Sequence, residues 1–301
     1  MNRKIIPALL VLALVVMACQ IPSSLPNSVP PAAASTALPP KPADLTVEML
    51  RNGTYFAPYY GRTVTLVNGA FSAGTGADKY SIKMLDLVTF GDLNGDGVND
   101  ATFIMVEDGG GSGQFESVIA VLNAGGTPTP AGYAKLGDRV QIHSLAIAAG
   151  QLNLKMLVQG PNDPMCCPSQ IVKQTYQMVK NIFWLTQIST FTPDNQERSL
   201  IINSPVGEAS VTNPFTINGS FTIAPFENNL AVRIYLPDET KVNESALTVD
   251  PGGVAGGPGK FSKTIDLSSA GITGTIIVQF LDVSAADGST MALASVVVNI
   301  H

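Results

Sequence analysis

The chain has 301 residues, and its 17 basic and 23 acidic side chains give a formal net charge of −6 at pH 7. This acidic balance argues against nucleic acid and against anionic lipid as partners bound by charge. Only 13% of the residues are charged, whereas 28 are glycine and 21 are proline, a composition typical of short strands joined by many turns. An apolar fraction of 45% is sufficient to build the cores of about two domains.

The first residues have the three-part pattern of a secretory signal. Arg3 and Lys4 precede an apolar run at residues 5–16 that is too short to span a bilayer, and the small residue Ala18 follows it. The segment Val-Met-Ala-Cys at 16–19 resembles the lipobox of bacterial lipoproteins, whose cysteine carries lipid. The resemblance implies a signal peptide at 1–18 and a membrane anchor on Cys19, with the mature chain extracytoplasmic, at the cell surface or in the periplasm. The alternative is an ordinary cleaved signal beside an incidental cysteine.

Residues 19–43 are predicted to connect the lipid to the folded part of the chain. From Gln20 to Ala43 there are seven prolines and one charged residue, Lys41, so neither a helical face nor a core can form. Proline-rich chains extend by about 3.1 Å per residue, which gives this tether a reach of up to roughly 70 Å.

Residues 44–198 are predicted to form an α+β, strand-rich domain. Asp44 is expected to cap a short helix at 45–51, and Gly53 to end it. The Asn68-Gly69 pair predicts a hairpin between strands at 63–67 and 70–72, because both residues tolerate positive φ. Further strands are predicted at 80–90, 101–107, 117–122, 140–148, 152–159 and 171–188. The last is long enough that we expect a bend near Lys180.

An acidic loop in this domain has the spacing of a calcium site. Oxygen ligands recur at alternate positions of a tight, glycine-containing loop, with a backbone carbonyl at the seventh position. The predicted ligands are Asp92, Asn94, Asp96, Val98 and Asp100. An EF-hand would need an acid at position twelve, where Phe103 stands. The loop, preceded by Phe90-Gly91, is instead similar to the shorter calcium loop of FG-GAP repeats; the alternative is a simple Asx-type turn.

Cys166 and Cys167 are the only other cysteines. Outside the cytoplasm they are expected to be oxidised, and we predict a disulfide between them, with buried thiols and redox or intermolecular chemistry as alternatives. The segment around them, 163–168, together with the calcium loop, the glycines at 109–113 and Leu-Gly-Asp-Arg at 136–139, resembles a domain of uncharacterised bacterial envelope lipoproteins. That family implies no activity.

Residues 199–301 are predicted to form an immunoglobulin-like β-sandwich. Apolar residues alternate with polar ones at 215–223 and again at 230–236, and strands are expected at 260–267, 274–283 and 291–300. These residues include Ser-Pro-Val-Gly at 204–207, Pro214-Phe215, Gly219, Phe226-Glu227, Gly259, Phe261 and Asp287-Gly288. This pattern is similar to the immunoglobulin-like domain of bacterial spore germination proteins and implies an envelope-associated module.

No Gly-x-Ser-x-Gly, His-Glu-x-x-His or Walker sequence occurs, and the chain has only two histidines. We therefore expect a protein that is not an enzyme and that binds or scaffolds in the cell envelope. Its expected partners are the membrane, through lipid, and an unknown envelope protein or glycan. The alternatives are an envelope glycan hydrolase that uses paired carboxylates, and a periplasmic inhibitor or chaperone-like lipoprotein.

Overall fold

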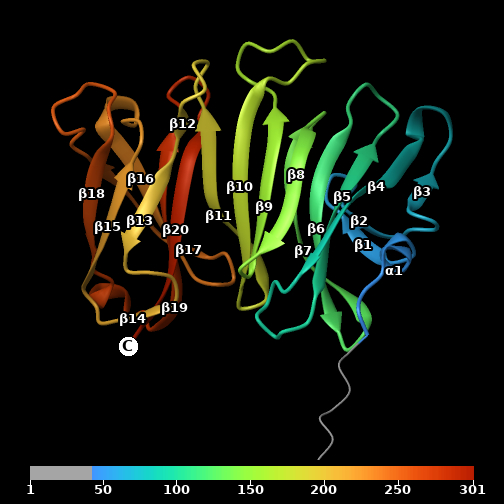
Figure 1. The fold of residues 1–301 in the computed structure, drawn as a ribbon, viewed down its shortest axis with the longest axis horizontal. Coiled ribbons are helices and arrows are strands. Elements are labelled where there is room, and N and C mark those ends of the chain that lie inside the picture. The colour runs from blue at the N-terminus through green and yellow to red at the C-terminus, as the bar shows by residue number, and fades with distance from the viewer. Residues whose placement is uncertain (1–42) are drawn as a thin grey trace, which may run out of the picture. The chain divides into compact units, whose positions relative to one another are not determined.

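The computed structural model describes residues 43–301; the predicted signal peptide, Cys19 and all but the last residue of the tether lie outside the described residues. Strands dominate this part of the chain and form sheets of ten, five, three and two strands (Figure 1). The prediction of a mostly β, sandwich-type fold is therefore confirmed. None of the described helices is long and apolar enough to cross a membrane.

The ten-stranded sheet contains strands from both predicted domains. One part consists of β17 (Lys241–Thr248), β16 (Asn229–Tyr235), β19 (Gly274–Val283) and β20 (Thr290–Ile300), in that order. It continues through β11 (Ile182–Phe191), β10 (Gln170–Val179), β9 (Gln151–Val158) and β8 (Gln141–Ala148). The short strands β12 (Glu197–Arg198) and β14 (Ala209–Val211) pair with β11 and β20. The predicted boundary at residue 199 thus separates two parts that share one sheet.

The five-stranded sheet packs on one face of the β8–β11 part. Its order is β3 (Ala70–Ala73), β4 (Tyr80–Gly91), β5 (Asp100–Asp108), β6 (Phe115–Ala124) and β7 (Thr127–Asp138). The core between the two sheets includes Ile104, Val118, Leu154 and Ile188. On its other face, the five-stranded sheet packs against α1 (Val47–Arg51), β1 (Thr54–Ala57) and β2 (Arg62–Thr65).

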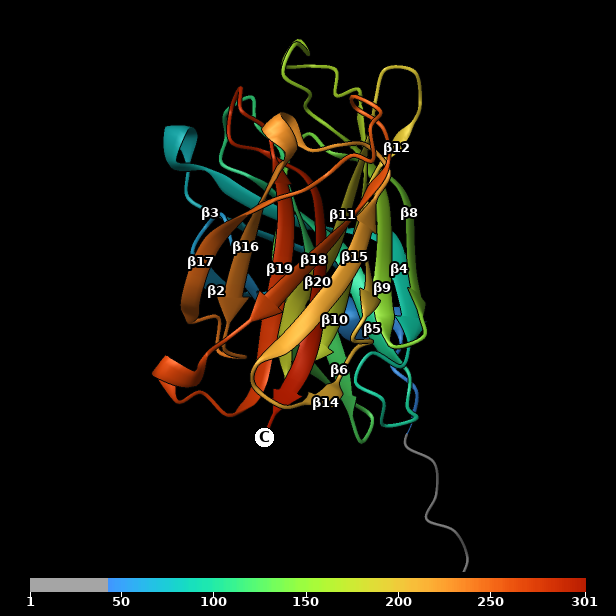
Figure 2. The same cartoon turned by 90° about the vertical axis from the view of Figure 1, so that its left-hand side faces the viewer.

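The three-stranded sheet covers the opposite face of the ten-stranded sheet. It consists of β13 (Leu200–Ser204), β15 (Phe215–Phe221) and β18 (Gly259–Ile265). In Figure 2, β15 and β18 cross in front of β19 and β20. Neighbouring residues of β20 identify the two faces. Leu293, opposite Ile188, points into the core shared with the five-stranded sheet, whereas Ala294 points into the core under the three-stranded sheet. Short 3-10 helices lie at Gly76–Asp78, Phe226–Asn228 and Ser268–Ala270.

Several local predictions need correction. Thr46, not Asp44, caps α1, because its hydroxyl accepts the Met49 N–H. The helix ends at Arg51, with Asn52 instead of Gly53 as the residue that follows it as C-cap. Asn68 and Gly69 do form a turn with positive φ, but β2 pairs with β1 and β3 with β4, so only a single bridge joins Val67 to Ala70. The predicted long strand at 171–188 is a hairpin whose turn residues, Lys180 and Asn181, both have positive φ.

Substitution of Leu293 tests whether the two parts of the ten-stranded sheet fold as one unit. Leu293 belongs to β20, but its side chain is buried in the core shared with the five-stranded sheet. Leu293→Ala should therefore lower the free energy of unfolding by about 2–5 kcal/mol. Urea unfolding, followed by Trp184 fluorescence and by far-UV circular dichroism, should show one coincident transition that shifts as a whole. The control is Leu247→Ala on the edge strand β17, where the half-buried side chain should cost less. Two separate transitions, only one of which shifts, would contradict the shared unit.

Candidate functional site

One face of the ten-stranded sheet is only partly covered. The three-stranded sheet packs over β16, β19 and β20, but β10 and β9 have no strand in front of them in Figure 1. Successive side chains of a strand point to opposite faces of the sheet, so only every second residue of β9 and β10 lies on the uncovered face. Leu152 and Leu154 of β9 point inward and are buried, so Asn153 and Lys155 point to the uncovered face.

The first row of side chains on this face runs across four strands. Asn153, Thr175, Gln187 and Ala294 lie opposite one another on β9, β10, β11 and β20. The Thr175 hydroxyl donates to Asn153 Oδ1 at 3.2 Å. Gln187 is half-buried, and its side-chain amide has no hydrogen-bond partner within residues 43–301. The centre of the row therefore keeps an amide donor and an amide acceptor for another molecule.

The second row carries charge. Lys155 and Lys173 lie opposite each other on β9 and β10, and Ser189 of β11 lies beside Lys173. Glu197 of β12 accepts from Lys173 Nζ at 2.8 Å and from Ser189 Oγ at 2.6 Å. Burial raises the pKa of Glu197, but these two bonds and the attraction of Lys155 outweigh it and lower that pKa overall. Lys155 forms no ion pair in the described part of the chain.

A wall formed by β13 and the turn after it turns this face into a groove. Two hollows, of about 290 and 310 Å³, lie side by side and share Thr175 and Gln187. The first also contains Gln151 and Gln177, whose amides bond to each other at 3.3 Å, and the second contains Lys155. Ile201 and Val206 line the first hollow and are 48% and 73% exposed. We call this continuous surface the polar groove.

Four of the five predicted calcium ligands lie in the loop between β4 and β5, and the fifth, Asp100, is the first residue of β5. Asp92 accepts the N–H groups of Gly95 and Gly97, at 2.6 and 2.9 Å. Asp96 accepts the Val98 N–H at 2.8 Å and the Asn94 side-chain amide at 2.9 Å. The loop is therefore organised as a series of Asx turns closed on the backbone.

Asp100 faces away from the exposed part of this loop. It is fully buried, and its two oxygens accept the N–H groups of Leu93 and Asn123 at 2.8 and 2.9 Å. Burial raises its pKa, the two backbone bonds lower it, and the charges of Asp96 and Asp92 raise it further, with a net increase. Within residues 43–301, no group of three or more acidic, histidine or cysteine side chains is arranged to hold a metal ion.

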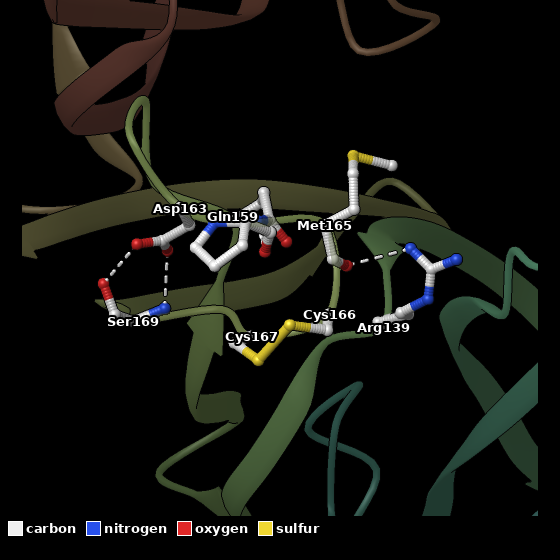
Figure 3. The surroundings of a disulfide bond; sticks show 8 residues. Arg139, Gln159, Asp163, Met165, Cys166, Cys167 and Ser169 are labelled. Atoms are coloured by element: carbon white, nitrogen blue, oxygen red, sulfur yellow. Dashed lines mark hydrogen bonds between the residues drawn. A yellow bond between two sulfur atoms is a disulfide. The ribbon is translucent and has the colours of Figure 1, made fainter.

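Cys166 and Cys167 are bonded to each other, with Cα atoms 3.7 Å apart, in the exposed loop between β9 and β10 (Figure 3). Asp163 braces this loop by accepting from both the N–H and the hydroxyl of Ser169, which lowers the pKa of its carboxyl. Arg139 donates to the Met165 carbonyl at 3.0 Å from the other side. The disulfide therefore belongs to a well-braced loop beyond the end of the polar groove strands.

Besides Asp100, two more buried carboxylates lie in the five-stranded sheet, away from the polar groove. Glu107 accepts the backbone N–H groups of Tyr59 and Tyr60, and Glu116 accepts that of Val140. Burial raises the pKa of Glu116 to about 7. Because backbone donors satisfy both groups, their contacts are those of structural side chains.

These observations define the class of the protein: a β-sandwich module that shares its main sheet with a second strand-rich unit. Residues 199–289 match the family described as the immunoglobulin-like domain of bacterial spore germination, Gmad2. This match confirms the resemblance in that part of the sequence, and immunoglobulin-like sandwiches are typical non-catalytic modules. Comparisons with curated proteins and with solved structures find no match.

Proposed function

We propose that this chain is a non-catalytic, lipid-anchored protein of the bacterial cell envelope that binds a partner in the polar groove. The observation that carries the proposal is the uncovered face of the shared sheet. There, polar side chains from three strands line a continuous groove. Gln187, which both hollows share, has no side-chain hydrogen bond in the described chain, and Lys155 in the second hollow forms no ion pair there. Concave surfaces with a few convergent polar groups are typical of binding sites.

The groove can be tested in living cells with the full-length chain. A photo-crosslinking amino acid in place of Gln187 should give discrete adducts with an envelope component on irradiation. The same replacement at Asn243, an exposed residue of the edge strand β17, provides the control and should give none. Equal labelling from both positions, or none from Gln187, would remove the groove from the proposal.

The lipid anchor makes a separate prediction. If the resemblance of residues 16–19 to a lipobox is functional, Cys19→Ser should abolish incorporation of radiolabelled fatty acid. The variant should then be recovered as unprocessed or released protein instead of in the detergent phase, because stable anchoring requires the acyl chains. Acyl labelling that persists in the variant would refute the anchor.

We also propose that the loop at 92–100 binds calcium as a structural ion. The support is the placement of three carboxylates in one short segment: burial raises the pKa of Asp100, and repulsion from the charges of Asp96 and Asp92 adds to that increase. A hard cation held by oxygen ligands would relieve this repulsion. The side chains of Asp92, Asn94 and Asp96 and the Val98 carbonyl would supply ligands; Asp100 would have to exchange a backbone bond to join them.

Calcium should therefore stabilise the full-length protein. At a hundredfold excess over Kd, a ligand that binds only the folded state adds about 2.7 kcal/mol to the free energy of unfolding. Calorimetry in detergent with calcium or with chelator should show this increase, and Asp96→Asn should reduce it, because the amide keeps an oxygen ligand but removes a negative charge. The matched control is Asp287→Asn, which alters an exposed Asx turn between β19 and β20 and should keep the calcium response. Identical melting with calcium and with chelator would show that the loop is only a turn.

A further inference from the structure

We infer that the polar groove binds a polysaccharide that carries carboxylate groups, with a neutral sugar over Gln187 and a carboxylate at Lys155. The inference rests on the proposed function and names the chemistry of its ligand. Three features of the groove support it: the amide and hydroxyl groups of its floor, the positive charge contributed by Lys155, and the aliphatic side chains of its wall.

The floor of the first hollow offers only uncharged polar groups. Gln151, Gln177, Gln187 and Thr175 contribute three amides and a hydroxyl at the surface of adjacent strands. An amide presents donor and acceptor side by side, which matches the paired hydroxyls of a sugar ring. The 3.3 Å bond between Gln151 and Gln177 is long, so a ligand hydroxyl that replaces it breaks only a weak contact.

The second hollow adds a positive charge. Lys173 is paired with Glu197, and Lys155 is attracted by the same carboxylate but forms no ion pair among residues 43–301, so two lysines and one carboxylate leave one positive charge in this hollow. Its half-buried position reduces screening by water, and Ser144 and Asn153 line the same hollow. A carboxylate bound there would gain a charge-assisted hydrogen bond, in a chain whose overall charge is otherwise negative.

The wall formed by β13 and the turn after it favours a glycan over a peptide as the ligand. A peptide would be expected to pair with the free edge of β13, as in strand addition. However, Leu200 is only 1% exposed, and Pro205, which follows β13, has no N–H to donate. Strand pairing along this edge is therefore confined to the five residues of β13. Ile201 and Val206 instead present exposed aliphatic surface beside the polar floor, which suits the C–H face of a sugar ring.

The two hollows share Thr175 and Gln187, so one chain can occupy both. Each hollow has a volume near the lower end of the range for small-ligand sites, which fits consecutive sugar units better than a bulky folded partner. The ligand class that meets all these conditions is an extended polysaccharide in which neutral and carboxylated sugars follow one another.

Calorimetric titration of the full-length protein in detergent provides the test. The probes are a hyaluronan hexasaccharide, in which N-acetylglucosamine alternates with glucuronate, and chitohexaose, which contains glucosamine units with the same acetyl group but no carboxylate. Hyaluronan should bind more tightly than chitohexaose. Lys155→Gln should weaken hyaluronan binding roughly tenfold, the cost of one charged hydrogen bond, with little effect on chitohexaose. Gln187→Ala should weaken both.

Lys260→Gln on β18 is the matched control, because this lysine is exposed and lies outside the groove. The inference is overturned if neither oligosaccharide binds, if Lys155→Gln changes nothing, or if an alternating Glu-Gly hexapeptide binds as well as hyaluronan. Photo-crosslinking from Gln187 separates these failures from failure of the proposed function. Adducts from Gln187 without glycan binding would leave a binding groove with another ligand, whereas the absence of adducts would remove the groove itself.

Discussion

The architecture depends on one short strand pairing, that of β11 with β20. Three residues of each strand are in register, from Gln187 to Ser189 and from Ala292 to Ala294. Because side chains alternate across a sheet, this pairing sends Ile188 and Leu293 into one core and Ala294 into the other. The two sandwich partners therefore lie on opposite faces of one sheet. Because the three-stranded sheet packs over β16, β19 and β20 only, one face of β9 and β10 stays uncovered next to β13.

An uncovered sheet face is more stable in water when its side chains are polar, and most side chains on this face are polar. The outward residues of β9 and β10 are Gln, Asn, Thr and Lys except at the end nearest the loop at 159–169, where Leu157 and Ile171 lie opposite each other. The polar residues pair across strands, as Thr175 does with Asn153. The inward residues, such as Leu154 and Met156, supply the burial. Alternate residues of the same strands therefore have different roles: the inward residues stabilise the core, and the outward residues line the groove. Groove side chains can thus be changed without disturbing the core.

The sequence predicted those features that depend on local chemistry. The periodicity at 215–223 located β15, and the prediction of a bend near Lys180 came close to the real turn. The sequence did not predict β7, because Pro128 and Pro130 argue against a strand. Both prolines are tolerated because β7 is the edge strand of the five-stranded sheet. Nor could the sequence predict the groove. The polar residues of β9 indicate an exposed face, but only the non-local pairing of β11 with β20 shows what lies beside it.

The acidic loop illustrates how local and non-local contacts combine. Its Asx turns follow from spacing, but the burial of Asp100 follows from β6, because Asn123 of that strand donates its backbone N–H to the carboxylate. The Asn123 side chain also donates to the carbonyls of Asn99 and Ala43, at 3.3 and 2.9 Å. Ala43 is the first described residue, where the predicted tether ends. Asp100 and Asn123 therefore join the start of β5, the strand β6 and the point at which the chain enters the fold. An ion that stabilises this loop would act at that junction and not in the polar groove, because no residue of the loop lines either hollow.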